Sequence, residues 1–199
     1  MAKGRAGAVR YAILGGLALL VVVILLVGLP RGVPLLSRLV QGCALLGYAC
    51  VFLAIVSSAF TKPLVRLYGR PFVQVHHWVS VTGEAMLMLH PIFFAVQMRS
   101  LEVFLPSFAS LRIFLSLGGR VAWYLIGVAA SAAFLRKIIG RNWRFIHWLN
   151  YVAFTLATPH AILIGSTFQN PVMRVVALLM LAVVVAVFIK RHIWKTATR

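Results

Sequence analysis

The chain has 199 residues, 62% of them hydrophobic, and its mean hydropathy of +0.99 is typical of an integral membrane protein. It has only two acidic residues and no aspartate, which excludes a Ser-His-Asp triad and leaves little for a zinc or carboxylate-bridged metal site. The net charge of +18 is divided among short loops, which argues against nucleic-acid binding and favours contact with anionic lipid head groups.

Six apolar runs predict an all-α integral membrane protein, with six transmembrane helices in one bundle. The expected spans are Tyr11–Leu29, Leu35–Phe60, Phe72–Gln97, Val121–Leu135, Phe145–Ser166 and Val172–Ile189. The fourth run is short for a hydrocarbon core about 30 Å thick, so we expect that helix to begin earlier, near Phe114. The segments between the runs are short, so we expect residues 1–199 to form a single transmembrane domain, without a flavin- or nicotinamide-binding domain.

The first run follows three basic residues and has the general layout of a signal peptide. Its apolar stretch is too long, and no small-residue cleavage site follows it. We therefore expect Tyr11–Leu29 to be retained as a transmembrane helix.

The basic residues predict the orientation of the bundle. Fourteen of the twenty fall in one set of loops, namely Lys3, Arg5, Arg10, Lys62, Arg66, Arg70, Arg136, Lys137, Arg141, Arg144, Lys190, Arg191, Lys195 and Arg199. The opposite set carries the other six, which are Arg31, Arg38, Arg99, Arg112, Arg120 and Arg174. The positive-inside rule places the richer set in the cytoplasm, so both termini are expected there.

Two other features of the chain have structural interpretations. Cys43 and Cys50 lie in the second span, two turns apart on one helix face, so we expect buried thiols rather than a disulfide. The segment Leu101–Leu117 lies on the predicted outer side. It suits either an amphipathic interfacial helix or a re-entrant loop.

Two histidines in the third span are the most informative feature of the sequence. His76 and His90 are 14 residues apart, which is ~21 Å along an ideal helix and only ~40° around it. Both rings therefore project from nearly the same face. His77 would point away, and we interpret it as an interfacial residue. Ionisable residues within membrane helices are costly and mark functional sites by default.

The fifth span repeats the arrangement with His147 and His160, which are 13 residues apart. An ideal helix would misalign this pair, and we expect Pro159 to re-phase the helix between them. The depths match those of the third span and predict the pairs His76 with His147 and His90 with His160. Neutral imidazole is a good axial ligand for haem iron, so two facing pairs predict two haems across the membrane.

Glu84 is the only acidic residue expected deep inside a span. The sequence leaves two interpretations open. The carboxyl group is either a structural hydrogen-bonding group, with Asn150 or a backbone carbonyl as its partner, or part of a proton path.

The sequence resembles the ferric reductase-like transmembrane domain superfamily over about residues 40–191, through motifs on the third and fifth spans. The third span carries His76-His77-Trp78-Val79 and ends with Leu89-His90. The fifth carries Trp143-Arg144, His147 and Tyr151 in the spacing W-R-x-x-H-x-x-x-Y, followed by His160.

The superfamily includes ferric reductases, NADPH oxidases and the haem-binding membrane subunit of the methionine sulfoxide reductase system. The chain is similar to its stand-alone haem b subunits. The resemblance implies b-type haem with His76, His90, His147 and His160 as the iron ligands, and electron transfer from cytoplasm to exterior. His76-His77 stands where the methionine sulfoxide reductase subunit has basic residues, which favours two haems.

The predicted function is therefore transmembrane electron transfer by a multi-pass protein of the plasma (inner) membrane. The donor is expected to be a cytoplasmic flavoprotein or a quinol, so a flavin or quinone is supplied by or shared with a partner. The acceptor is expected on the outer side, either an anionic compound such as a ferric chelate or a docking reductase subunit. Two alternatives remain, a small proton-coupled transporter and a membrane scaffold subunit without a cofactor.

Overall fold

The computed structural model describes residues 32–68 and 71–193, and all regular elements in these ranges are helical. The long helices are α2 (Leu35–Ala59), α4 (Pro71–Met98), α6 (Gly118–Phe134), α9 (Leu149–Ile164) and α10 (Pro171–Phe188). Between and after them lie short elements, namely α3 (Thr61–Tyr68), η1 (Leu101–Phe104), α5 (Leu111–Ser116), α7 (Arg136–Ile139), η2 (Gly140–Asn142), α8 (Trp143–His147), η3 (Ser166–Gln169) and η4 (Ile189–Ile193). The predicted helix Tyr11–Leu29 lies outside the described residues.

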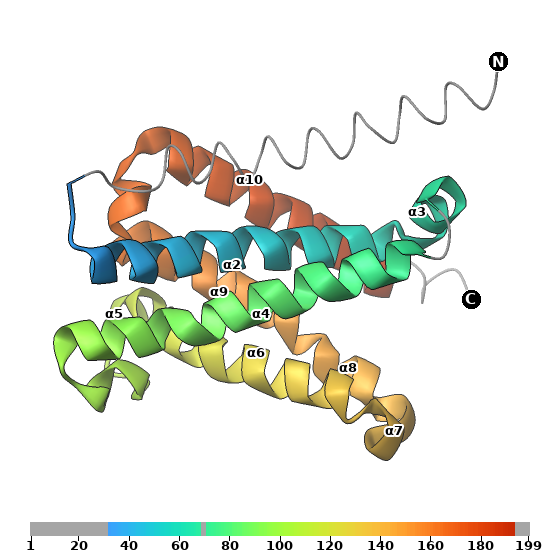
Figure 1. The fold of residues 1–199 in the computed structure, drawn as a ribbon, viewed down its shortest axis with the longest axis horizontal. Coiled ribbons are helices and arrows are strands. Elements are labelled where there is room, and N and C mark those ends of the chain that lie inside the picture. Colours follow the sequence, from blue (N-terminus) through green and yellow to red (C-terminus); the bar gives the residue numbers. More distant parts are fainter. Residues whose placement is uncertain (1–31, 69–70, 194–199) are drawn as a thin grey trace.

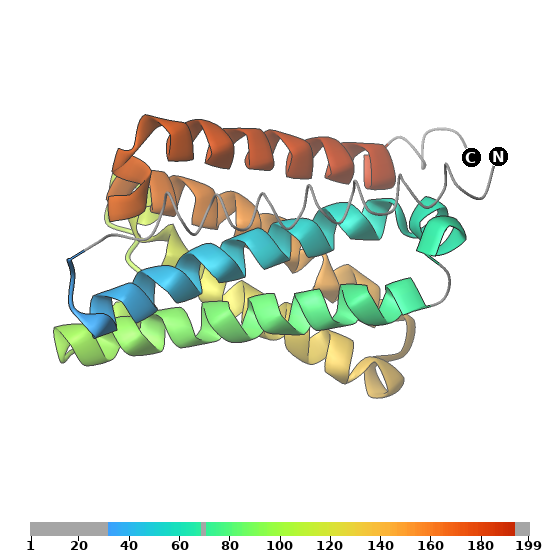
Figure 2. The ribbon, with the colours of Figure 1, turned by 45° about the horizontal axis from the view of Figure 1, so that its top comes forward.

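The five long helices run along the longest axis of the molecule and alternate in direction (Figure 1). Helices α3 and α7 lie at one end, here called the α3 end, and α5 lies at the other, here called the α5 end (Figure 1). Helix α2 packs most extensively on α4, and α6 on α9, while α10 lies over α9 and α2 (Figure 2). Among the described residues, the basic ones of α3, α7, α8 and η4, which belong to the richer set, therefore lie at the α3 end (Figure 1).

Five of the six predicted helices are present close to their expected bounds, with one correction. The helix expected to begin near Phe114 begins at Gly118, and Phe114 belongs to the separate short helix α5. Ser110 caps α5, because its side chain accepts a hydrogen bond from the Ile113 amide. The segment predicted as an interfacial helix or re-entrant loop consists of η1 and α5 at the α5 end.

A second correction concerns the helix that carries His147 and His160. The helix is interrupted at Trp148, which separates α8 from α9, and it continues without a break through Pro159. The change in phase between the two histidines therefore arises at Trp148, one residue after His147. Proline removes one hydrogen bond, but a helix surrounded by partners can accommodate this loss.

Three of the described helices are long and apolar enough to cross a membrane, namely Leu35–Ala59, Val73–Met98 and Pro171–Arg191. A fourth candidate is the pair Gly118–Phe134 and Arg136–Ile164, which meet at a 74° bend. The protein is thus a multi-pass membrane protein. Six spans and the cytoplasmic location of both termini remain predictions.

Small residues occupy the interfaces between helices. Alanines make up much of the buried set, whereas large apolar side chains on α4 and α10 are exposed. Gly83 is needed where α2 and α4 cross, because an added Cβ would lie 2.8 Å from the Cβ of Cys50 and 3.1 Å from the Val51 amide nitrogen. Cys43 and Cys50 are buried free thiols, as predicted. This distribution suits a bundle surrounded by lipid, since helices in membranes associate through close packing.

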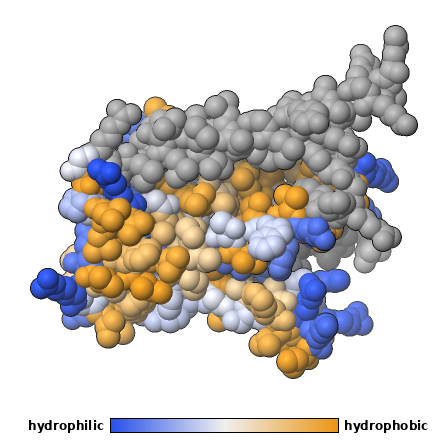
Figure 3. Space-filling model, viewed as in Figure 1, coloured by the Kyte–Doolittle hydropathy of each residue, from blue (hydrophilic) through white to orange (hydrophobic). Residues whose placement is uncertain are grey.

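Hydrophilic side chains gather at the two ends of the molecule. The face shown in Figure 3 is mainly hydrophobic between these ends, apart from a few paler side chains. A band of this kind matches the hydrocarbon core of a bilayer, with the α3 end and the α5 end in the two head-group regions.

Candidate functional site

The four histidines singled out in the sequence line two separate cavities in the interior of the bundle. The first, here called the apolar cavity, lies toward the α5 end and is lined by His90 and His160 among mainly apolar side chains. The second, here called the polar cavity, lies toward the α3 end and is lined by His76 and His147. The empty space is about 930 Å³ in the apolar cavity and about 970 Å³ in the polar one, open edges included. The pairs that share a cavity are those expected from the sequence.

In the apolar cavity, each histidine is held by a backbone carbonyl of a neighbouring segment. His90 Nδ1 lies 2.8 Å from the Val40 oxygen on α2, and His160 Nδ1 lies 2.6 Å from the Ser116 oxygen on α5. A carbonyl oxygen only accepts, so Nδ1 of each ring donates. A neutral imidazole that donates from Nδ1 has an unprotonated Nε2, which is free to bind a metal.

Gly119 lies directly against the His160 ring. An added Cβ at this position would lie 2.5 Å from Nε2 and 2.5 Å from Cδ2 of His160, so a larger residue would displace the ring. Gly119 therefore keeps space beside the nitrogen that is free to bind a metal. It also lines the apolar cavity itself.

In the polar cavity, His76 is held by a serine hydroxyl. Ser57 Oγ donates its only proton to the Ala54 carbonyl at 3.1 Å, so toward His76 Nδ1, also at 3.1 Å, it accepts. Nδ1 of His76 therefore donates, and Nε2 is unprotonated, as in the apolar cavity.

His147 is held from two sides. Its Nδ1 lies 3.2 Å from the Ala129 carbonyl oxygen on α6 and 3.3 Å from Asn150 Nδ2 one turn further along the chain. The Ala129 carbonyl can only accept, so Nδ1 of this fourth ring also donates. All four rings thus present an unprotonated Nε2.

The polar cavity contains hydrophilic groups that the apolar cavity lacks. Its walls include Ser80, Glu84, Asn150 and two arginines, Arg144 and Arg191. Asn150 is 8% exposed, and its Oδ1 is buried without a hydrogen-bond partner among the described residues. The sequence suggested a bond between Glu84 and Asn150. Both line the cavity, but within residues 32–68 and 71–193 the Asn150 side-chain amide lies against His147 Nδ1, at 3.3 Å, rather than against Glu84.

His77 is exposed and does not line either cavity, although it is adjacent to His76. The helical rotation of ~100° per residue carries its ring away from the interior. The structure therefore places the two neighbouring histidines on different sides of α4.

The donor set suits a haem with two axial histidines. In the part of the chain that the structure describes, no three histidine, cysteine or acidic side chains converge on one point, so a tetrahedral protein-only metal site is not formed. Two imidazoles with unprotonated Nε2 atoms that line one cavity could hold the iron of a haem between them. A hydrogen bond at Nδ1 of each ring is the usual support for a ligating histidine.

A packed aromatic layer separates the two cavities. Tyr48 on α2 stacks on Phe154 on α9, with ring centroids 4.4 Å apart, and its hydroxyl hydrogen-bonds to Thr158 at 2.8 Å. Tyr48 lines the apolar cavity, whereas Tyr151, one turn before Phe154, lines the polar one. Tyr48 and Phe154 belong to one buried cluster, against which Tyr151 packs.

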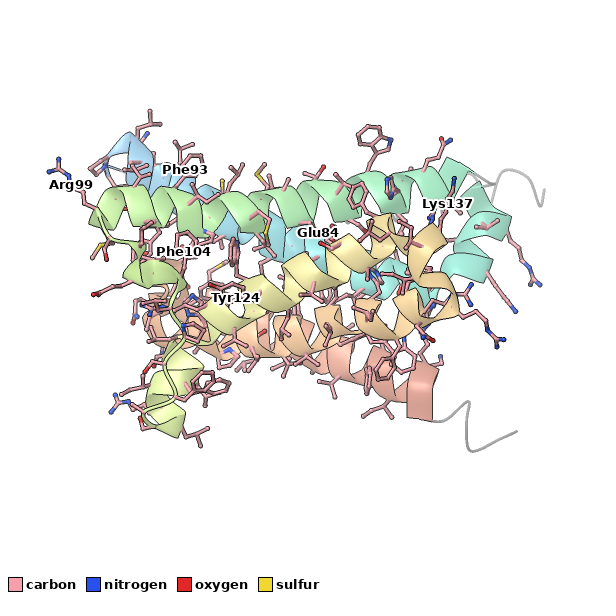
Figure 4. The ribbon with its side chains drawn as sticks, turned by 90° about the horizontal axis from the view of Figure 1, so that it is seen from below. Glu84, Phe93, Arg99, Phe104, Tyr124 and Lys137 are labelled. Carbon is pink, nitrogen blue, oxygen red and sulfur yellow. The ribbon has the colours of Figure 1, made fainter. Side chains whose placement is uncertain are left out.

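The segment between α4 and α6 covers the apolar cavity at the α5 end. Phe104 lines the cavity and packs on Trp123, with ring centroids 5.2 Å apart. Arg120 donates to the Leu105 carbonyl at 2.5 Å, and the Tyr124 hydroxyl donates to the Phe104 carbonyl at 3.0 Å. Figure 4 shows Phe104 and Tyr124 close together toward this end of the molecule. These bonds fix the cover over the site.

Sequence reasoning missed several residues that shape the cavities, among them Gly119, Tyr48 and the carbonyl acceptors of Val40 and Ser116. No pattern distinguishes Gly119 from the other glycines, and a backbone acceptor leaves no trace in the sequence. Asn150 could have been found as a partner of His147, because residues three apart share a helix face.

Comparison with known proteins relates the chain to one family. The family model described as a ferric reductase-like transmembrane component matches residues 43–158, more than half of the chain. This region contains His76, His90 and His147, whereas His160 follows it by two residues. Neither a search of curated proteins nor a search of solved structures gave a match.

Proposed function

The chain belongs to the ferric reductase-like transmembrane component family, and we propose that it transfers electrons across a membrane through two b-type haems. Domains of this family usually bind haem and serve in membrane electron transfer. His76 and His147 would hold one haem in the polar cavity, and His90 and His160 would hold the other in the apolar cavity.

The observation that carries the proposal is that all four histidine rings are hydrogen-bonded through Nδ1 and have an unprotonated Nε2. Each has Nδ1 bonded to a protein acceptor, which orients the ring and leaves Nε2 as the free nitrogen. Solitary histidines in a membrane bundle would more often bond across helices by whichever nitrogen is nearer. Four identical arrangements, two per cavity, favour ligation over isolated structural hydrogen bonds.

Haem iron, when bound, cycles between the ferric and ferrous states and so accepts and gives up one electron at a time. The chain would contribute the ligands and hold the two sites at separate depths in the bundle. The Tyr48–Phe154 stack separates the cavities, and the Thr158 hydrogen bond holds that stack in place. Arg144 and Arg191 at the polar cavity, and Arg120 at the apolar cavity, supply positive charge for carboxylate groups of a bound macrocycle.

We infer a direction from the α3 end, facing the cytoplasm, to the α5 end. The basic side chains at the α3 end favour an acidic flavoprotein as donor, with a quinol as the other possible source of electrons. The acceptor would be an anionic compound or a reductase subunit near Arg99, Arg112 and Arg120. A flavin or quinone would then be supplied by the partner.

The visible absorption spectrum of the protein, purified from haem-replete cells, tests the proposal. We expect a Soret band and sharp α and β bands on reduction, the signature of low-spin haem with two axial histidines. A colourless preparation would exclude electron transfer by haem and leave the proton-coupled transporter or the scaffold subunit.

The direction is tested by stopped-flow reduction in vesicles of defined orientation. A donor that docks on Arg66, Arg70, Arg141 and Arg144 should reduce the haem from the α3 end. The rate should fall as ionic strength rises, because the Debye length shrinks from about 10 Å at 0.1 M to about 3 Å at 1 M. Reduction from the α5 end alone would reverse the proposed direction.

A further inference from the structure

We propose that Glu84 is a redox-linked proton-binding site. Its carboxylate takes up one proton from the aqueous phase at the α3 end when the haem site of the polar cavity gains one electron, and releases it on reoxidation. The inference rests on the proposed function, in that His76 and His147 must hold a haem. It adds a chemical role that electron transfer alone does not require.

The position of Glu84 is the first argument. The residue lies midway along α4, within the candidate span Val73–Met98 (Figure 4). It lines the polar cavity together with His76 and His147. Within the described residues, its carboxyl group has no hydrogen-bond or ion-pair partner. An acidic group at this depth is costly and is retained where it serves an ion or proton pathway.

The second argument is access. The polar cavity extends from Glu84 past Ser80, one helical turn away, to Ser58 and Arg191. Arg191 is exposed at the α3 end and donates to Ser58 Oγ at 2.7 Å. The cavity thus offers a hydrophilic route between the carboxyl group and water. The apolar cavity contains no acidic residue, so the α5 end offers no equivalent acceptor.

The third argument is electrostatic. An electron added to the polar cavity leaves that region one charge more negative, and in a medium of low dielectric an adjacent carboxylate opposes this change. Protonation of Glu84 removes the repulsion and keeps the local charge constant. Electrons and protons therefore enter the site together, one of each.

Other titratable or charged groups face the same region and must be distinguished from Glu84. They are His76 on α4, Arg144 and His147 on α8, Tyr151 on α9, Arg191 on η4, and Cys50 on α2, whose Cβ lies near Gly83. The arginines stay charged throughout the accessible pH range, and histidines that bind iron cannot take up the proton at Nε2. Propionates of the bound haem are the remaining candidate, and only a variant of Glu84 separates them from the carboxyl group.

The test is a set of potentiometric titrations from about pH 5 to about pH 9, the range in which carboxyl groups in protein interiors titrate. In the wild type, the midpoint potential of the polar-cavity haem should fall with a slope approaching about 59 mV per pH unit, the value for one proton per electron. Glu84→Gln should have a flat profile. Glu102→Gln, which changes the other acidic residue of the chain, is the matched control and should retain the wild-type slope.

A flat wild-type profile, or an equal slope in Glu84→Gln, would overturn the proposal. If Glu84→Gln does not retain haem, Glu84→Asp provides the second variant. The pH range over which its midpoint potential changes should differ from that of the wild type. An unmoved profile would count against Glu84. Absence of haem from the His76 and His147 pair would instead refute the proposed function, and the absorption spectrum distinguishes this case.

An independent readout is proton uptake on reduction, measured with a pH-indicator dye in weakly buffered detergent solution. The wild type should take up close to one proton per polar-cavity haem reduced, and Glu84→Gln should take up few or none. Equal uptake by the two proteins would assign the proton to another group.

Discussion

The apolar cavity and the polar cavity each contain a pair of histidines with unprotonated Nε2 atoms, but within different walls. The apolar cavity surrounds His90 and His160 with aliphatic and aromatic side chains and one arginine, Arg120. The polar cavity places Glu84, Asn150, serine hydroxyls and two arginines beside His76 and His147. If both pairs hold haem as proposed, the surroundings become the main means of setting the two reduction potentials.

The difference between the walls indicates the order of the potentials. The ferric site with two neutral ligands carries one more positive charge than the ferrous site, and burial among apolar groups disfavours the charged form. The apolar cavity should therefore have the higher potential. The carboxylate of Glu84 favours the ferric form in the polar cavity and opposes the effect of Arg144 and Arg191 at the edge of that cavity. Electrons would then move downhill from the α3 end to the α5 end.

The largest expected effect comes from removing one ligand of one cavity. His160→Ala should eliminate haem from the apolar cavity and halve the haem content, while the polar-cavity haem remains. His76→Ala should do the reverse, and the two remaining spectra should titrate at different potentials. Loss of both haems from either variant would show that the cavities are not independent sites.

A smaller effect is expected from crowding the apolar cavity without removing a ligand. Gly119→Ala would place a Cβ against Nε2 and Cδ2 of His160, so we expect weaker haem retention in this cavity alone. The matched control is Gly127→Ala on the same helix, where an added Cβ meets no atom within 4 Å. Haem content after dialysis compares the two. Equal retention would contradict the assigned role of Gly119.

A third effect is expected from removing the positive charge of Arg144, an exposed residue at the edge of the polar cavity. Arg144→Gln should lower the midpoint potential of the polar-cavity haem by about 20 to 40 mV, because exposed charges interact by up to about 1 kcal/mol and about 1.4 kcal/mol corresponds to 59 mV. Arg141→Gln, which lies outside the cavity, should leave it unchanged. If the midpoint potential of the apolar-cavity haem shifted more than that of the polar-cavity haem, the assignment of Arg144 to the polar cavity would be wrong.

The smallest expected effect concerns His77. His77→Ala should leave haem content and both potentials unchanged, because the side chain is exposed and faces neither cavity. It is also the matched control for His76→Ala, one residue away. Loss of the polar-cavity haem from His77→Ala would shift the ligand assignment by one residue.

Much of the fold was predictable because the apolar runs of the sequence are long. The five predicted helices that fall within the described residues are present, and the histidine pairs share cavities as their depth along the helices predicted. Helix boundaries were less predictable. Ser110 caps the separate helix α5, and the start of α6 at Gly118 follows the turn at Leu117. Neither feature interrupts the apolar pattern strongly enough to be recognised.

The sequence predicted which histidines share a cavity, but not the groups that hold their rings in place. Histidines in an apolar run stand out, whereas the Val40 and Ser116 carbonyls that orient His90 and His160 are ordinary backbone atoms. The change in phase between His147 and His160 was expected at Pro159, because proline is the recognised helix breaker, whereas the helix is interrupted at Trp148. The contrast between the cavities arises only when α2, α4, α8 and α9 come together and place Glu84 and Asn150 on one wall.

The ratio of haem to protein, measured by pyridine haemochrome assay on the purified wild-type chain, tests the central claim most directly. Two histidine pairs in two cavities predict a ratio near two, with a single b-type haem species in the assay. A ratio near one would leave one cavity without haem, and a ratio near zero would contradict the account of both.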